Sequence, residues 1–196
     1  MKNNIIGLFL LLCTLNIQLV SAQRHYRPEI SVGVKFGTNL SNTTFQPKVQ
    51  EGLLLGYMGG LSFRYIEEKH FGFIVEANFS QQGWKEDFEN EPYQFSRKMN
   101  YIQIPFMSHI FFGNKFFRGF VNLGPQVGFF ISDSYKSNFD INNPPTFTSS
   151  SRETQQYTMP IANKVDYGIT AGAGLEFRIL RSSFLLESRY YFGLGD

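Results

Sequence analysis

The stretch Val165–Leu194, VDYGITAGAGLEFRILRSSFLLESRYYFGL, decides the fold. Its first half alternates strictly between apolar and polar residues, and a second alternating run follows after a short break. The apolar set of the first half is Tyr167, Ile169, Ala171, Ala173, Leu175, Phe177 and Ile179. Because side chains of a strand point alternately to two faces, this stretch predicts a β-hairpin with one apolar face and one polar face.

The charged residues of the polar face suggest how the two strands pair. A turn at Ser182–Ser183 would place Glu176 opposite Arg189. The same register places Arg178 opposite Glu187, whereas a turn one residue earlier would place the two glutamates opposite each other. Opposite charges stabilise a cross-strand pair and like charges destabilise it. We therefore predict the register with the turn at Ser182–Ser183.

The hairpin alone leaves two kinds of protein open. In a soluble sheet the apolar face lines a packed core, whereas in a membrane barrel it faces lipid and the charges point into a polar lumen. The composition narrows the choice. The 196 residues suit one domain, and a net charge of +2 gives no indication of nucleic-acid binding. Aromatic residues at 17% together with 18 glycines are typical of an all-β barrel.

The first 22 residues predict a cleaved secretory signal peptide. Lys2 precedes a mostly apolar run, and Ser21 and Ala22 are small residues ahead of the expected cut. A membrane-anchoring helix is the alternative, and the polar residues inside the run disfavour it. The single cysteine, Cys13, lies in this segment, so the mature chain is expected to use neither disulfides nor thiolate chemistry.

Residues 23–29 are expected to form a periplasmic leader, and residues 30–196 the barrel. Apolar and polar residues alternate in seven segments, which we predict to be strands. These segments are residues 30–37, 53–65, 71–80, 102–112, 117–131, 165–179 and 184–194. The links between them alternate in length: residues 39–52, 81–97 and 133–164 are long, whereas residues 67–70 and 113–115 are short.

This separation of long loops from tight turns is how outer-membrane barrels are built. The sequence therefore predicts an all-β, antiparallel, up-and-down transmembrane β-barrel, exported to the cell outer membrane of a Gram-negative bacterium. Bacterial single-chain barrels have even strand numbers, and an open sheet edge is costly in lipid. Seven strands are visible of an expected eight, so we expect the closing strand to be missing from this chain, or closure to occur by irregular pairing.

Four segments together resemble the PorT-like outer-membrane β-barrel family. They are Gly33–Asn39, Asn100–Phe106 (NYIQIPF), Gly124–Gly128 (GPQVG) and Asp166–Glu176. The resemblance extends over nearly all of the mature chain. It implies an eight-stranded barrel that ends in an aromatic strand, which this chain lacks. The named member of that family is linked to a system that secretes proteins across the outer membrane.

Charged side chains on the predicted inner face are the candidate site residues. We interpret them as a structural charge network in the lumen, made by Glu76, Glu176, Arg178, Glu187 and Arg189. A buried proton or ligand site is the alternative. His109 lies on the same face but Ser108 lies on the other, so we expect no catalytic pair. Aromatic residues near strand ends are expected at the membrane interface: Trp84, Tyr93, Tyr101, Tyr190, Tyr191 and Phe192.

Eight strands enclose side chains rather than a water channel, so a porin is not expected. The sequence favours a small non-porin barrel with a structural or interaction role, linked to protein secretion or envelope assembly, without catalysis, cofactor or metal. Its expected partners are outer-membrane lipid and proteins that contact the loop Asp133–Lys164, with no nucleic acid. The alternative function is a secreted soluble ligand-binding β-barrel.

Overall fold

The fold is described by a computed structural model, which covers residues 27–41, 51–87, 92–145, 157, 161 and 163–195. The expected signal peptide, most of the leader and most of the loop at residues 146–162 lie outside the described residues. The strands are β1 (Glu29–Ser41), β2 (Glu51–Gly52), β3 (Leu54–Ile66), β4 (Phe71–Asp87), β5 (Gln94–Gly113), β6 (Phe117–Ser137), β7 (Val165–Ile179) and β8 (Ser182–Gly193). No helix among these residues is both long and apolar enough to cross a bilayer.

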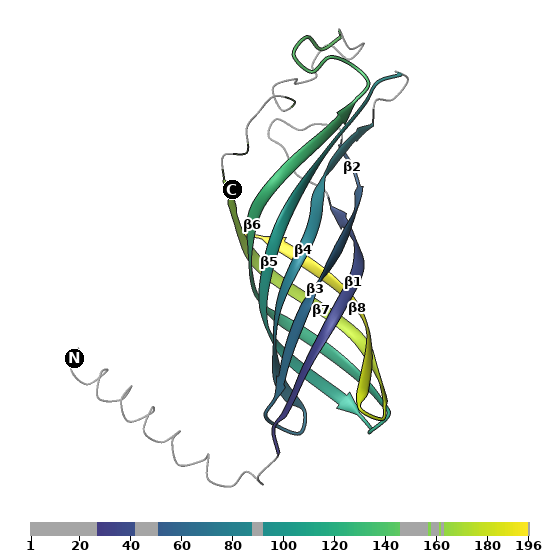
Figure 1. Ribbon diagram of the computed structural model, residues 1–196, viewed down its shortest axis with the longest axis vertical. Coiled ribbons are helices and arrows are strands. Elements are labelled where there is room, and N and C mark those ends of the chain that lie inside the picture. Colours follow the sequence, from purple (N-terminus) through teal and green to yellow (C-terminus); the bar gives the residue numbers. More distant parts are fainter. Residues whose placement is uncertain are drawn as a thin grey trace, which may run out of the picture.

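Seven long strands form one antiparallel sheet in the order β1-β3-β4-β5-β6-β7-β8, and the short β2 pairs with β4. Each long strand therefore pairs with the next one along the chain. Figure 1 shows these strands inclined and curved around a common axis, with the short turns at one end and the long connections at the other. The predicted all-β, antiparallel, up-and-down architecture is confirmed.

The sheet curls far enough to bring its two edges toward each other. Among the described residues, β1 pairs only with β3 and β8 only with β7. On the inner side, however, the ammonium of Lys35 in β1 lies 3.9 Å from the carboxylate of Glu187 in β8. Arg178 in β7 likewise bonds to Glu29 in β1. The sheet is thus a partly closed barrel whose edge strands are bridged by side chains instead of backbone hydrogen bonds.

The polarity of the barrel wall is opposite to that of a soluble protein. Apolar side chains point outward and are exposed, as with Phe36 at 86% and Leu123 at 55%. Charged side chains point inward and are buried, as with Glu176 at 0% and Arg64 at 5%. This pattern matches a wall surrounded by hydrocarbon and excludes the packed apolar core that a soluble ligand-binding barrel would need.

The register predicted for the last hairpin is wrong. Ile179 pairs with Ser182 across a two-residue turn, so Glu187 lies opposite Gly174 and Arg189 opposite Gly172. Glycine leaves space for the long charged side chains: a Cβ at residue 172 would lie only 2.5 Å from the Glu187 carboxylate. The charges therefore reach across the lumen, and direct cross-strand charge pairing does not set the register.

The turn of this hairpin contains an unfavourable backbone conformation. Leu180 has a φ of 56°, a region in which residues with a Cβ are disfavoured, and its side chain is fully exposed. Leu180→Gly is therefore expected to raise the free energy of unfolding by about 1 kcal/mol, measured by denaturant titration in detergent micelles. Arg181→Gly is the matched control, because Arg181 has no positive φ and should gain nothing. A loss of stability in Leu180→Gly would contradict the prediction.

Three strands run well past the predicted ends. Residues 81–87 and 94–97 were expected in a link but belong to β4 and β5, and residues 133–137 were expected in a loop but belong to β6. As a result β4, β5 and β6 have 17, 20 and 21 residues, whereas β8 has 12. A barrel strand needs only about 9–11 residues to cross a bilayer. The three strands extend past β7 and β8 at the end opposite the short turns (Figure 1), so their ends reach beyond the length that a bilayer crossing needs.

Candidate functional site

The middle of the lumen contains four linked charged side chains, here named the central charge cluster. Arg189 in β8 donates hydrogen bonds at 2.8 and 3.1 Å to the Glu76 carboxylate in β4, and two more at 2.7 and 3.2 Å to Glu187. Lys35 in β1 donates to the same Glu76 carboxylate at 2.9 Å. The amide of Asn78 donates a further hydrogen bond to Glu76 at 2.8 Å. Glu76 thus connects the first strands of the sheet to the last.

A second cluster lies nearer the short turns. Arg64 in β3 donates to Glu176 in β7 at 2.8 Å, and Arg118 in β6 lies 3.9 Å from the other oxygen of that carboxylate. Arg64 and Glu176 are both buried. This pair also crosses the lumen, since β3 and β7 are not neighbours in the sheet.

All five predicted site residues point inward, but the structure divides them into three groups. Glu76, Glu187 and Arg189 share the central charge cluster, Glu176 pairs with Arg64, and Arg178 pairs with Glu29 at the rim. Glu29 and Asn78 were not expected among the partners. The contact of Glu29 with Arg178 crosses the gap between β1 and β7, so no pattern along the chain identifies it, whereas Asn78 lies two residues from Glu76 on the same face of β4. That the charges act as a structural network remains a prediction.

His109 is fully buried in the lumen and has a polar and an aromatic environment. Its Nδ1 lies 2.7 Å from the side-chain oxygen of Asn122, whose amide donates to Glu187 at 2.8 Å. The rings of Phe111 and Phe120 lie 5.2 and 5.3 Å from the imidazole. His109 is therefore joined through Asn122 to the central charge cluster.

Toward the loop end, the outward positions of β4, β5 and β6 change from apolar to polar. The last lateral row of outward apolar residues is Phe79, Ile102 and Phe129, which pair across the three strands, with Ile131 exposed just beyond it in β6. Beyond it, the outward positions are polar: Gln81, Asn100 and Ser132, then Lys98 and Ser134, then Lys85, Ser96 and Lys136. Over the same span the inward positions combine aromatic residues, Trp84 and Phe95, with charged ones, Glu86 and Arg97. The loss of outward apolar residues marks the level at which we place the passage of the wall from lipid into water.

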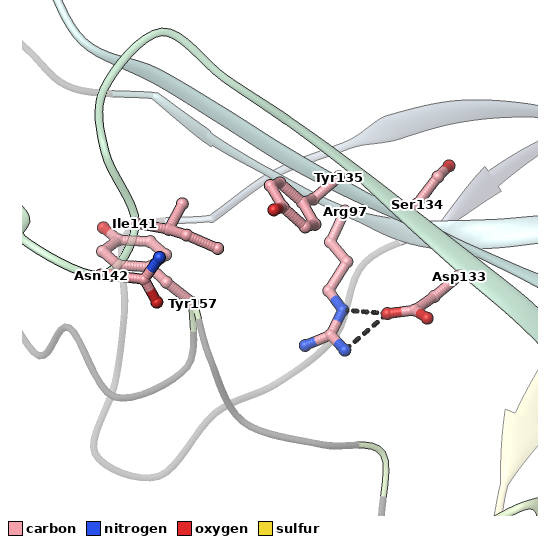
Figure 2. Close-up of a pocket in the computed structure, with 7 residues that line it drawn as sticks. All are labelled: Arg97, Asp133, Ser134, Tyr135, Ile141, Asn142 and Tyr157. Carbon is pink, nitrogen blue, oxygen red and sulfur yellow. Dashed lines mark hydrogen bonds and ion pairs between the residues drawn. The ribbon is translucent and has the colours of Figure 1, made fainter.

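A β-bulge in β6 shapes the inner side of this extension. The register shifts between Asn100 and Tyr101 of β5, so that one extra residue of β6 is accommodated near Ile131. The extra residue turns Asp133 and Tyr135 inward, toward Arg97. The Nε of Arg97 donates to the Asp133 carboxylate at 2.8 Å. Figure 2 shows Arg97, Asp133 and Tyr135 on one side of the strands, with Ser134 pointing to the other.

Aromatic side chains pack beside this ion pair in what we name the loop-end aromatic cluster. Its buried members are Trp84, Phe95 and Tyr157, and Tyr93, Met99, Phe139 and Ile141 pack against them. Tyr157 comes from the long connection between β6 and β7, and its hydroxyl donates to Glu86 at 2.7 Å. The cluster is a small apolar core above the membrane, and it attaches one part of the long loop to the extension.

A cavity of about 550 Å³ opens beside this cluster. Figure 2 shows its lining residues: Arg97, Asp133, Ser134, Tyr135, Ile141, Asn142 and Tyr157. An ion pair, a side-chain amide and two tyrosines can together bind a polar group by hydrogen bonds and pack against an apolar surface beside it. No cluster of three potential metal ligands occurs among the residues that the structure describes.

The expected belt of interfacial aromatics is only partly observed. Tyr190 and Phe192 point outward and are 71% and 57% exposed. Trp84 and Tyr101 instead point inward and are buried, because both lie at inward positions of β4 and β5. For Trp84 the expectation failed because β4 continues past the apolar band, where the inner side needs aromatic residues for its own small core.

Comparison with known proteins agrees with the architecture. No curated protein and no solved structure matched the chain. A family model described as outer membrane protein beta-barrel domain matches residues 21–196, which is most of the chain. With its outward apolar wall and its charged lumen, the chain therefore belongs to the outer membrane protein beta-barrel domain family.

Proposed function

We propose that the protein is a non-porin barrel that acts as an interaction platform at the outer membrane, without catalysis. The lumen supports the first part of this proposal. Side chains of the central charge cluster cross it from β4 to β8, and the Arg64–Glu176 pair crosses it again from β3 to β7. Two successive layers of crossing side chains favour a lumen filled by side chains over an open channel.

The loop-end extension is the observation that carries the proposal. Strands β4, β5 and β6 continue beyond the apolar band and hold a cavity with polar and aromatic lining. A barrel that served only to fill the membrane would not need such an extension. Partner proteins are expected to contact this end through Tyr135, Asn142 and the loop Asp133–Lys164.

A role in protein secretion or envelope assembly is the more specific part of the proposal. It is supported by the resemblance of Asn100–Phe106 and Gly124–Gly128 to the PorT-like barrels, one of which is linked to secretion. The family match supports the outer-membrane barrel and leaves the role of this member to experiment.

Site-specific photo-crosslinking in cells tests the platform. A photo-reactive phenylalanine is introduced at Tyr135 or Asn142, which line the cavity. The same residue introduced at Lys115, in the turn at the opposite end, is the matched control. The expected result is a discrete crosslinked envelope protein from the first two positions and none from the third. Crosslinks only from Lys115, or ion conductance of the purified protein in planar bilayers, would contradict the proposal.

A changed set of secreted proteins in a deletion strain is the result expected for the secretion role.

A further inference from the structure

The outward face of the loop-end extension carries three lysines, Lys85 in β4, Lys98 in β5 and Lys136 in β6. We propose that this face, here named the lysine face, binds the phosphate groups of anionic lipid headgroups in the leaflet at the loop end. The inference rests on the outer-membrane placement and concerns the outside of the wall, whereas the cavity lies on the inside.

The sheet register sets the height of the lysine face above the lipid. Lys98 lies four residues beyond Ile102, which belongs to the last apolar row. At a rise of about 3.3 Å per residue and a strand tilt of about 40°, its Cα stands about 10 Å above that row. The polar headgroup layer begins at the edge of the hydrocarbon and is roughly 5–8 Å deep. Because a lysine can extend its ammonium along the wall, Lys98 reaches back into this layer.

The surroundings of these lysines favour an anion. Lys85 and Lys136 flank Ser96 in one lateral row, and Lys98 lies between Gly83 and Ser134 in the row below. Lys85 already interacts with another group, so Lys98 and Lys136 are the lysines that carry the proposal. Of the acidic residues near them, Glu86 bonds to Tyr157 and Asp133 bonds to Arg97 on the other side of the sheet. The ammonium groups of Lys98 and Lys136 thus stand with the hydroxyls of Ser96 and Ser134 on the outward face.

Protection of a sheet edge is the ordinary explanation for lysines on an outer strand. It fits Lys136, since β6 beyond Phe130 has no partner on its β7 side among the described residues. It does not fit Lys98, because β5 is paired with β4 on one side and with β6 on the other at this level. The turn at the opposite end is also mixed in charge, with Glu67 and Glu68 beside Lys69. Protection of a sheet edge therefore leaves Lys98 unexplained.

Native mass spectrometry of the purified full chain tests the lysine face. The protein is held in micelles doped either with phosphatidylglycerol, which is anionic, or with phosphatidylcholine, whose phosphate is neutralised by choline. Lys98→Gln with Lys136→Gln is expected to lower the apparent affinity for phosphatidylglycerol on the order of tenfold, because each lysine near an anionic surface adds a several-fold preference. Retention of phosphatidylcholine should not change.

The matched control is Lys69→Gln with Lys115→Gln, which removes the same charge at the short-turn end. Its affinity for phosphatidylglycerol is expected to stay within twofold of the unaltered protein. Equal affinity in the Lys98 and Lys136 variant, or an equal loss in the control, would overturn the proposal. Electrophoresis of unheated samples shows whether each protein is folded, and it therefore distinguishes a loss of lipid binding from a loss of the fold. All three proteins should migrate as folded barrels, and if the unaltered protein did not, the membrane placement and the lysine face would both be wrong.

Discussion

Replacing Glu76 with glutamine is expected to lower the free energy of unfolding by about 3–5 kcal/mol, the cost of removing one partner from a buried ion pair. Arg189 and Lys35 both bond to the Glu76 carboxylate, and its side chain is almost fully buried in the lumen. Glutamine keeps the shape and one hydrogen-bond acceptor but removes the negative charge. Two cations would then remain in the lumen with only Glu187 to neutralise them.

Denaturant titration of the refolded protein in vesicles measures this loss. Glu29→Gln is the matched control, because Glu29 also pairs with an arginine across the seam but both side chains are partly exposed. Its loss is expected to be below about 1 kcal/mol, as for other exposed pairs. The double variant Glu76→Gln with Arg189→Gln should cost less than the sum of the two single changes, since it removes both charges of one pair. Equal losses in Glu76→Gln and Glu29→Gln would show that the central charge cluster is not a coupled unit.

The sequence was sufficient to predict the direction in which each strand residue points. Strict alternation in Val165–Ile179 and in the earlier segments places Glu76, Glu176 and Arg189 inside, and the structure agrees. Alternation alone cannot identify the partner of each charge. Glu176 meets Arg64 from β3, and Arg189 meets Glu76 from β4, so each pairing depends on how tightly the sheet curls.

The register of the last hairpin shows the same limit. Cross-strand charge pairing is worth only roughly 0.2–1 kcal/mol per pair, less than the contacts that a buried charge makes across a lumen. Gly172 signals the true arrangement, because a Cβ there would collide with the Glu187 carboxylate, and a Cβ at residue 174 would collide with the ring of Phe120. The two glycines thus leave space in the lumen for larger side chains, which favours the observed register.

The loop-end extension was missed for a different reason. Residues 81–97 are polar and charged, which is typical of a loop. Their alternation does persist, with Trp84 and Glu86 inward and Lys85 outward, but the outward residues are no longer apolar. The bulge that turns Asp133 toward Arg97 leaves no signal in the sequence, because it depends on the register between two strands.

Replacing Leu123 with arginine is expected to lower the free energy of unfolding in vesicles by about 2–4 kcal/mol, the cost of a cation on the lipid face near the bilayer midplane. Leu123 lies near the middle of the outward apolar positions of β6, between Ser108 and Ala171 of the adjacent strands, and is 55% exposed. In a soluble barrel the same exposed position would tolerate arginine within about 0.5 kcal/mol. The two environments therefore predict clearly different results for one substitution.

Ser134→Arg on the same strand locates the boundary of the membrane. Ser134 also points outward, but it lies beyond the last apolar row, opposite Lys98. Its replacement should cost at most a few tenths of a kcal/mol, from repulsion by that lysine. A tolerated arginine at Leu123 would mean that water surrounds the wall, whereas a large loss at Ser134 would mean that lipid covers the extension. Hydrocarbon alone makes an exposed leucine costly to replace with a charge. A loss of stability confined to Leu123→Arg would therefore agree with a wall that leaves the bilayer beyond Phe129 and Ile131, where its outward residues become serine and lysine.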